Sequence, residues 1–369
     1  MKIGIITMHK VHNFGSHLQA YALQERIKLL GNDVTLIDYK YPNEFHKNKL
    51  TLTSIVKKTV FLPYYIRNSL ITFVQKRKFK TFENHFFNLS VPFNSQKEIE
   101  NNELSYDLYI TGSDQVWNPR FAKGDTVFML SFVKQDVEKI AFGPSLAVSE
   151  IPYNYIHNYK EWLSKYKRIG VRDNNTKVVL ENLLGYEVDR VTDPVFLLSK
   201  EQWELIAKRS SKLYPKKFIF VFILTYSFNP YPEIIEFIKR IREYYNLPVV
   251  FYNVSLKRKI QIKPELNIYS AKVEDFLWLI KNADFIVTSS FHVTAFSIIF
   301  EKQFLAFTNN IEKDSRIIDL CNDLSIKNYC TLENFSLEKI SKIDYQSVRP
   351  NLKKMIDSSL RFLEEAIGE

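Results

Sequence analysis

The chain has 369 residues, and its 46% hydrophobic and 25% charged residues are typical of a folded globular protein, which excludes disordered and fibrous classes. Because domains commonly hold about 100–200 residues, this length predicts two compact units. With 51 Lys and Arg against 41 Asp and Glu, the formal net charge of +10 favours anionic partners, but charge alone does not distinguish phosphorylated metabolites, acidic glycans, nucleic acid and lipid.

Neither cysteine pairing nor a targeting segment is expected. Cys321 and Cys330 form no CxxC motif, so we predict reduced core residues in a reducing compartment. The hydrophobic run within residues 1–10 is too short for a secretory signal and is interrupted by His9. The longest apolar stretches, such as 218–224, fall well below the roughly 20 residues of a spanning helix. We therefore expect a cytoplasmic protein.

In the first half, short β-branched runs alternate with helical patterns, which is typical of a mostly parallel sheet with helices on both faces. Residues 2–8 read as the first strand. Ser16 followed by Gln19 has the form of a capping box, which predicts a helix over 16–30 that Gly31 ends. Further strands are predicted at 34–38, 107–111, 139–142 and 168–171. Their carboxyl edge is where such sheets bind ligands.

The second half repeats this pattern after a predicted break between 193–194 and 213–217. Its predicted strands are 218–224, 248–254, 284–288 and 304–307. Its predicted helices are 201–208, 232–245, 273–282, 291–300 and 314–324. We expect domains over 1–200 and 201–345, with a last segment, 346–369, whose helix at 351–367 crosses back to the first domain. A cleft between the two domains is the usual place for a substrate.

One segment, about 45–82, departs from this alternation because it contains no Asp or Glu between Phe45 and Phe82. Its basic residues are Lys47, Lys49, Lys57, Lys58, Arg67, Lys76, Arg77, Lys78 and Lys80. One interpretation is an amphipathic flap that contacts an anionic membrane or a lipid-linked phosphate. The other is a helical insertion with a solvated basic face. No nucleic-acid motif accompanies the charge, so we expect no nucleic-acid partner.

Several well-known catalytic motifs are missing from the chain. The sequence contains no GxGxxG, GxxxxGK, HExxH, CxxC or GxSxG. The sequence therefore gives no support for hydride transfer with a dinucleotide, for NTP hydrolysis, for a built-in transition metal or for the nucleophile elbow of α/β-hydrolases. We expect neither a metal nor a bound cofactor.

Four stretches carry the functional signal: 13–24 (NFGSHLQAYALQ), 110–119 (ITGSDQVWNP), 170–173 with 191–194 (GVRD and VTDP), and 288–297 (TSSFHVTAFS). In this order and spacing they resemble the polysaccharide pyruvyltransferase family, and 314–317 (DSRI) is similar to its C-terminal SRI element. The family usually has Ser-Phe-His-Gly-Thr where Val293 follows His292 here, so valine adds volume beside that histidine.

The resemblance implies two Rossmann-like domains facing across a cleft, as in the GT-B fold, with the acceptor on the N-terminal side and the donor on the C-terminal side. It implies phosphoenolpyruvate as donor and co-substrate. The implied acceptor is a glycan or lipid-linked oligosaccharide of a capsule, exopolysaccharide or wall, which receives pyruvate as a ketal. Two alternatives stay open: a glycosyltransferase that uses a nucleotide sugar, and a non-catalytic glycan- or membrane-binding member of the family.

On the donor side, His292 is expected near a helix start, where free N–H groups favour an anion, and it could serve as proton donor. A core or capping histidine is the alternative. Arg172 ends a strand, and its guanidinium can bind a carboxylate or phosphate, although a salt bridge to Asp173 or Asp189 is equally compatible. Further donor-binding candidates are Arg316 and, after a first role as helix caps, Ser289 and Ser290.

On the acceptor side, Asp114 could take a proton from a hydroxyl, or form an Asx-type cap in its turn. Trp117 could stack on a sugar ring, or pack in the core. The remaining acceptor-binding candidates are Asn13, Gly15, Ser16, His17 and Gln115, with Gly15 acting through its backbone.

Overall fold

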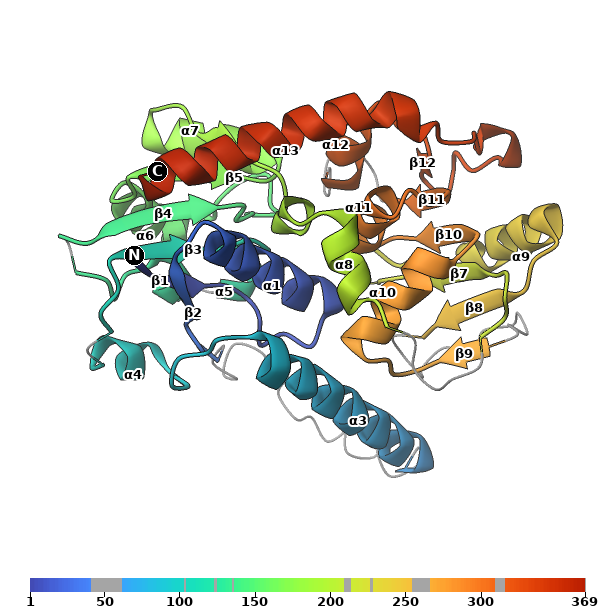
Figure 1. Cartoon of the computed structure of the whole chain (residues 1–369), viewed down its shortest axis with the longest axis horizontal. Coiled ribbons are helices and arrows are strands. Elements are labelled where there is room, and N and C mark those ends of the chain that lie inside the picture. Colours follow the sequence, from blue (N-terminus) through green and yellow to red (C-terminus); the bar gives the residue numbers. More distant parts are fainter. Residues whose placement is uncertain are drawn as a thin grey trace.

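The structure is a computed structural model that describes residues 1–40, 62–102, 104–122, 125–134, 136–208, 214–225, 228–253, 266–308 and 316–368. The described chain forms two six-stranded parallel sheets, which lie side by side in Figure 1. This confirms the predicted fold class of two Rossmann-like α/β units. Residues 45–61 of the basic segment and 314–315 of the last motif lie outside the described residues.

The first sheet has the strand order β2-β1-β3-β4-β5-β6. Its strands are β1 (Lys2–Ile6), β2 (Asp33–Leu36), β3 (Leu108–Thr111), β4 (Glu138–Phe142), β5 (Arg168–Val171) and β6 (Asp189–Arg190). One face packs against α1 (Phe14–Leu29) and the end of α13 (Tyr345–Ile367), and the other against α6 (Tyr153–Leu163) and α7 (Asn174–Leu184). Because both faces of the inner strands are buried, β1, β3 and β5 are mostly apolar, whereas the edge strand β6 is Asp-Arg and only half-buried.

The second sheet has the order β12-β11-β10-β7-β8-β9. Its strands are β7 (Ile219–Phe222), β8 (Val249–Tyr252), β9 (Leu266–Ile268), β10 (Phe285–Thr288), β11 (Phe304–Phe307) and β12 (Tyr329–Cys330). One face packs against α8 (Lys200–Ile206), α10 (Val273–Asn282), α11 (Phe291–Ile299) and α12 (Arg316–Asp323), and the other against α9 (Glu233–Tyr245). The chain therefore builds the same layered unit twice.

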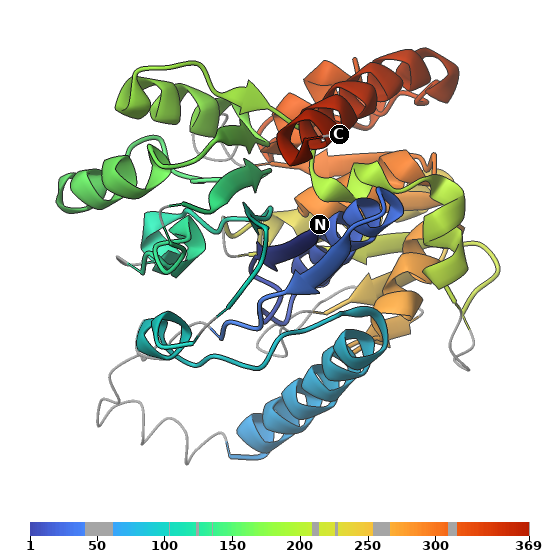
Figure 2. The same cartoon turned by 60° about the vertical axis from the view of Figure 1, so that its left-hand side comes forward.

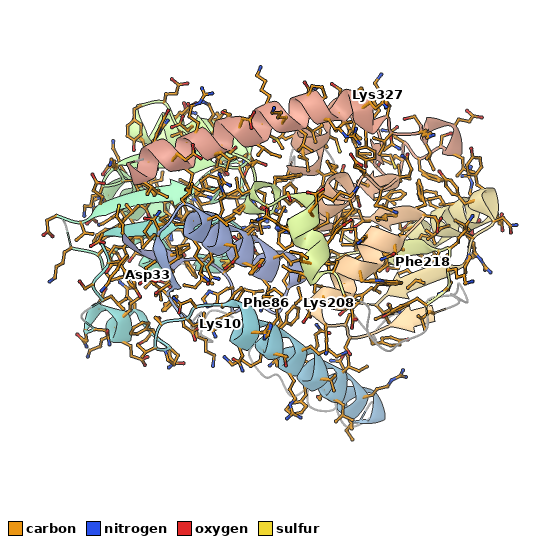
Figure 3. All side chains as sticks on the ribbon, in the orientation of Figure 1. Lys10, Asp33, Phe86, Lys208, Phe218 and Lys327 are labelled. Atoms are coloured by element: carbon orange, nitrogen blue, oxygen red, sulfur yellow. The ribbon has the colours of Figure 1, made fainter. Side chains whose placement is uncertain are left out.

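The remaining helices among the described residues are α3 (Leu62–Phe86), α4 (Gln96–Glu100), α5 (Pro119–Ala122), and the 3-10 turns η2 (Val127–Met129), η3 (Pro194–Leu197) and η4 (Leu337–Lys339). Figure 3 shows that side chains fill the space between the sheets and their covering helices. Across the part of the chain that the structure describes, no helix combines the length and the apolar character needed to cross a bilayer.

Two helix starts differ from the prediction. The cap of α1 is Asn13, whose side chain accepts from Gly15 N at 2.8 Å, so the predicted capping box at Ser16 is wrong. The Ser16 hydroxyl instead donates to Asp114, a partner that only the tertiary fold supplies. Helix α13 begins at Tyr345 and contains Pro350, whereas the prediction placed the start after this proline.

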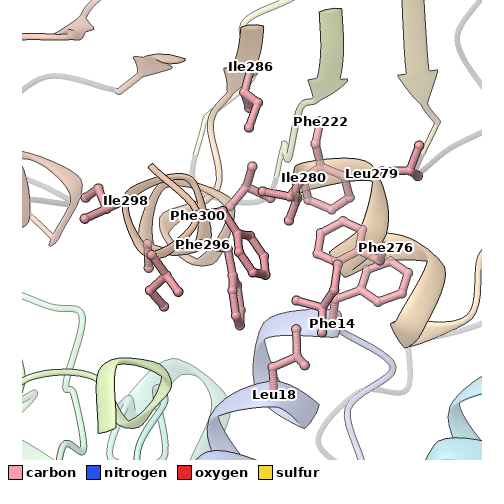
Figure 4. Close-up of a cluster of buried hydrophobic side chains, with 14 of the residues drawn as sticks. Phe14, Leu18, Phe222, Phe276, Leu279, Ile280, Ile286, Phe296, Ile298 and Phe300 are labelled. Atoms are coloured by element: carbon pink, nitrogen blue, oxygen red, sulfur yellow. The ribbon is translucent and has the colours of Figure 1, made fainter. Parts of the chain in front are cut away.

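The two sheets are joined by a shared apolar core. The ring of Phe14 from α1 stacks on Phe276 from α10, with centroids 4.0 Å apart and an interplanar angle of 4°. Figure 4 shows Phe14 and Leu18 directed at side chains of the second half. In addition, the Gln75 side chain of α3 exchanges two 3.0 Å hydrogen bonds with the backbone of Ala271. Such a continuous apolar contact favours a fixed relative orientation of the two halves.

The last helix, α13, contacts both halves along its length, as Figure 2 also shows. Near its end, Phe362 packs so closely on β5 that a Cβ at Gly170 would lie 2.8 Å from its ring. Arg168 of β5 lies over the same ring and also binds Glu365 at 2.7 Å. Glycine at position 170 therefore allows α13 to dock against the first sheet.

Candidate active site

The candidate site lies where loops from both sheets meet. In the first half, Asn13 follows β1, Asp114 follows β3, Arg172 follows β5 and Asp193 follows β6. In the second half, His292 follows β10, at the start of α11. All these strands are parallel within their sheets, so the loops gather at carboxyl edges, as in other open α/β sheets.

A buried ionic cluster links these loops. Arg172 Nη1 lies 2.5 Å from Asp193 Oδ2, and Arg172 Nη2 lies 3.3 Å from Asp114 Oδ1. The Arg172 side chain is 1% exposed and that of Asp193 is fully buried. His292 Nε2 lies 3.5 Å from the same Asp193 Oδ2. Asp193 therefore connects an arginine of one half with a histidine of the other.

Both carboxylates are held in the ionised form. Burial by itself would raise the pKa of Asp193, but His292 and Arg172 more than reverse this and hold it well below its usual range. For Asp114, burial likewise opposes ionisation, while Arg172, His292 and the hydrogen bond from Ser16 lower the pKa. At neutral pH the cluster therefore contains two negative carboxylates around one guanidinium.

Asp114 occupies an unusual backbone conformation, with φ of 81°. Its Oδ1 accepts from Gln115 N at 2.9 Å, the N–H of the next residue, whereas an Asx-type cap would bond two residues on, so the predicted cap is not formed. Its Oδ2 accepts from the Ser16 hydroxyl at 2.5 Å. Left-handed backbone at a residue other than glycine costs about 1–3 kcal/mol and is concentrated at functional sites. The carboxylate is thereby held in place by Ser16, Gln115 N and Arg172.

The His292 ring lies directly on the backbone of the first turn of α1. A Cβ atom at Gly15 would lie 2.0 Å from His292 Nδ1, so only glycine leaves room for the ring there. The His292 side chain is 12% exposed. Ser290 caps α11 by accepting from Val293 N, as predicted. The capped start of α11 and the absence of a side chain at Gly15 together determine the position of the His292 ring.

We therefore expect Gly15→Ala to lower the kcat/KM of any reaction that uses His292 by about 10²-fold, since a displacement of about 1 Å can have that effect. Position 15 is helical, so alanine should not weaken α1 itself. Gly185→Ala is the control: its φ of 79° costs about 1 kcal/mol of stability, but it lies outside this cluster and should keep full activity. Full activity of Gly15→Ala would contradict the contact.

A small pocket of about 40 Å³ opens beside His292 and is lined from both halves. Its lining residues are Asn13, Asp114, Gln115, Leu224, Ser289, Ser290, Phe291, His292, Arg316 and Ile317. With its amide oriented to satisfy its neighbours, Gln115 accepts from both terminal nitrogens of Arg316, at 2.9 and 3.2 Å. Most of the candidates chosen from the sequence thus line one pocket.

Two larger pockets adjoin the small one and differ in character. A pocket of about 300 Å³ shares Phe291 and Arg316 with it and is also lined by Lys354 and by the ion pairs Arg172–Asp193 and Arg190–Asp323, so its lining carries a net positive charge. A groove of about 470 Å³ shares Asn13 and Leu224 with the small pocket. Its other lining residues are His12, Phe14, Asn68, Ile71, Thr72, Gln75, Lys76, Phe79, Phe222, Thr225, Tyr252, Asn253 and Tyr269. A cationic pocket and a polar, aromatic groove therefore flank the small pocket.

Two predicted acceptor-binding residues are buried away from the pocket, which corrects the prediction. Trp117 has no exposed surface, and its Nε1 donates to Phe128 O at 2.9 Å, so it cannot stack on a sugar. His17 is also fully buried, and its Nε2 lies 3.2 Å from Glu83 Oε1. Burial lowers the pKa of His17, although Glu83 acts in the opposite direction. Trp117 lies in the buried turn before α5 and His17 on the largely buried helix α1, so both pack inside the protein.

Three more candidates have indirect roles. Ser16 is 4% exposed, and its hydroxyl is engaged by Asp114. Ser289 exchanges hydrogen bonds with the backbone of Leu224, at 2.8 and 3.0 Å, and so joins the loops after β10 and β7. Arg172 binds Asp114 and Asp193, and not the predicted Asp173 or Asp189. Asp173 instead caps α7, and Asp189 binds Arg168.

Val293, which replaces the usual glycine, does not enter the pocket. Its side chain is fully buried in the apolar cluster shared by the two halves. The residue therefore adds volume to the core, and the space beside His292 stays open.

Sequence reasoning missed Asp193 as a site residue. Its side chain also accepts from Val195 N at 3.1 Å, so it caps the turn η3 while it binds Arg172 and His292. A usable signal was present, because the Asp-Pro pair follows a strand at the ligand-binding edge of the sheet.

The overall fold is that of GT-B enzymes. UDP-GlcNAc 2-epimerase from Methanocaldococcus jannaschii superposes with a TM-score of 0.54 at 13% identity, with both chains covered completely. A putative UDP-N-acetylglucosamine 2-epimerase from Listeria monocytogenes gives 0.51 at 10% identity, covering 98% of this chain and 94% of that one. Trehalose-6-phosphate synthase OtsA gives 0.50 at 8% identity, covering 100% and 99%. At these identities the likeness concerns the fold alone.

The family can be stated more narrowly. The profile of the polysaccharide pyruvyl transferase family matches residues 13–311, and the chain belongs to this family. The match confirms the resemblance predicted from the motifs. No curated protein sequence matches the chain at a significant level.

Proposed function

We propose that the protein transfers the pyruvyl group of phosphoenolpyruvate to a sugar of a cell-surface polysaccharide precursor. Membership of the polysaccharide pyruvyl transferase family supports this reaction. The observation that carries the proposal is the position of His292, which lies with Asp114 and Arg316 in one pocket between the two halves. An acid–base group, a carboxylate and a cation are the groups that this chemistry requires.

The donor carries a carboxylate and a phosphate, and the cationic pocket offers matching charge. Arg316 lines both this pocket and the small one, so it is our candidate for direct contact with the donor. The first N–H groups of α11 add a partial positive charge beside His292. Because the terminal nitrogens of Arg172 already bind two carboxylates, we assign Arg172 the roles of positioning them and adding charge behind the donor.

The acceptor is a hydroxyl-rich glycan, and the groove on the other side of the small pocket has suitable chemistry. Its amide and hydroxyl side chains, such as Asn13, Asn68 and Asn253, can hydrogen-bond sugar hydroxyls. Tyr252 and Tyr269 supply apolar surface for sugar rings. A glycan or lipid-linked oligosaccharide lying in this groove would place one sugar beside Asp114 and His292.

The proposed reaction balances without a cofactor. His292 gives a proton to the methylene carbon of phosphoenolpyruvate while one sugar hydroxyl attacks the adjacent carbon and Asp114 or His292 accepts its proton. A second hydroxyl of the same sugar then displaces phosphate, which leaves with the second proton. The products are a pyruvate ketal and inorganic phosphate. Asp193 orients the imidazole through both steps.

Ligand-dependent melting provides a direct test. At about one hundred times its Kd, phosphoenolpyruvate should stabilise the fold by about 2.7 kcal/mol, or about 3 °C for a chain of this size. UDP-sugars at equal concentration should leave the melting temperature unchanged. The opposite result would favour a nucleotide-sugar enzyme, and stabilisation by neither ligand would count against both reactions.

A further inference from the structure

Helix α3 has two faces with different surroundings. One face packs on the second half, where Gln75 binds Ala271 and Lys78 binds Ser270, and it also lines the polar, aromatic groove. The opposite face is apolar and exposed. It consists of Ile66, Leu70, Phe73 and Val74, which are 52%, 60%, 56% and 42% exposed. Leu70 follows Ile66 by four residues, and Phe73 and Val74 follow Leu70 by three and four residues, so the four side chains form a single stripe.

Such a stripe is uncommon on a folded surface, where exposed large hydrophobic side chains are usually scattered. Among the described helices of this chain, α3 alone exposes four of them. Elsewhere they occur in ones and twos, such as Leu29 on α1 and Leu205 on α8. The stripe therefore indicates a binding surface for a partner that can contact apolar side chains.

The charges around the stripe indicate the kind of occupant. Arg67, Lys76, Arg77 and Lys80 are exposed on the same helix, and Arg77 lies 5.4 Å from the ring of Phe73. From residue 62 to residue 82 the helix contains no acidic side chain. An apolar stripe with basic side chains along it is the pattern of helices that lie in the interface of anionic bilayers.

The position of α3 connects this surface with the candidate active site. Figures 1 and 2 both show the helix along one margin of the molecule. Its inner face contributes Asn68, Thr72 and Phe79 to the groove that adjoins the small pocket. A bilayer in contact with the outer face would therefore lie one helix diameter, about 10 Å, from the groove.

We propose that the stripe Ile66, Leu70, Phe73 and Val74, with its flanking basic residues, docks the protein on an anionic lipid surface. The apolar side chains enter the interface while Arg67, Arg77 and Lys80 bind lipid phosphates. Resting on the proposed function, we add that the acceptor glycan is presented to the groove from that surface. The docking itself does not depend on the reaction.

Vesicle binding without substrates tests the docking. Wild-type protein should co-sediment with vesicles of phosphatidylcholine and phosphatidylglycerol, and at least about tenfold less with phosphatidylcholine alone. Leu70→Ser/Phe73→Ser should lower the partition coefficient by about tenfold or more, because two large apolar side chains no longer enter the interface. Arg77→Gln/Lys80→Gln should lower it by about thirtyfold at about 1 kcal/mol for each charge.

Matched control variants distinguish binding through this surface from non-specific adsorption to lipid. Leu29→Ser/Leu205→Ser removes two side chains elsewhere that are 60% and 75% exposed, at least as much as Leu70 and Phe73, and should leave vesicle binding unchanged. Equal binding to both vesicle types, or an equal loss in this control, would overturn the proposal. A third result would also overturn it. If the wild-type protein binds no vesicles but forms a dimer in sedimentation, and Leu70→Ser/Phe73→Ser dissociates that dimer, the stripe contacts a second copy of the chain.

The outcome also separates docking from the proposed reaction. If vesicle binding persists while phosphoenolpyruvate fails to stabilise the protein, the reaction is wrong and the docking surface remains. If phosphoenolpyruvate binds and vesicles do not, the docking surface is wrong and the reaction remains. Melting temperatures near the wild-type value for all three double-site variants would show that the folds are comparable.

Discussion

Replacing His292 with alanine is expected to lower kcat/KM for pyruvyl transfer by about 10³-fold, within the range for loss of a general acid–base group. The imidazole lies between Asp193 and the backbone of Gly15, on the wall of the pocket shared by both halves. No other side chain lining that pocket is a histidine, lysine or cysteine among the described residues. Phosphate release from phosphoenolpyruvate in the presence of the acceptor glycan measures the effect.

The same variant should bind phosphoenolpyruvate almost normally, because Arg316 and the start of α11 are unchanged. A melting shift close to that of the wild type would show this and separate chemistry from binding. His157→Ala is the control, since its side chain is 89% exposed on α6, and it should have no effect on either measurement. Activity of His292→Ala within about threefold of the wild type would remove His292 from the mechanism.

Replacing Asp193 with alanine is expected to lower the free energy of unfolding by about 3 kcal/mol, because the buried Arg172 loses its closest counter-charge. The matched control is Asp189→Ala, which also removes a carboxylate from an arginine at 3.0 Å. Since the Asp189 side chain is 46% exposed, its loss should cost no more than about 1 kcal/mol. Urea denaturation of the three proteins measures the difference, and equal losses would contradict the assigned burial.

The contribution of Asp193 should also depend on pH in a defined direction. Its pKa is lower in the folded protein than in the unfolded chain, where an aspartate has a pKa of about 3.9. The stabilisation is therefore fully present above about pH 4 and is lost as the pH falls toward the folded value. Asp193→Asn should lack this stabilisation at neutral pH, and its free energy of unfolding should therefore change less with pH in the acid range. Its kcat should fall as well, since Asn holds His292 without a charge.

The shared apolar core limits how such an enzyme can move. Phe14 of the first half is surrounded by Phe222, Tyr252 and Phe276 of the second, and α3 adds hydrogen bonds across the same boundary. Opening the two halves like a hinge would expose these rings to water, at about 25 cal/mol for each Å² of apolar surface. The structure therefore favours a site that is assembled before the substrates arrive.

Local sequence determined most of the architecture. Strands buried on both faces need nearly continuous apolar runs, so the positions of β3, β4, β5, β10 and β11 were readable to within a residue or two. The motif residues were also placed correctly at carboxyl edges, because parallel strands put their following loops on one side of a sheet. Asn13 and Asp114, expected on the acceptor side, and His292 and Arg316, expected on the donor side, line a single pocket.

Only the tertiary structure decided how those residues pair and which of them reach the pocket. The contacts of Arg172 with Asp114, of His292 with Asp193 and of His292 with Gly15 join residues far apart in the chain, and they follow from sheet register and from how the halves dock. Likewise, the burial of Trp117, His17 and Val293 depends on which side of each element meets the core. A sequence fixes the apolar pattern of each element, but long-range contacts form only when packed elements bring distant side chains together.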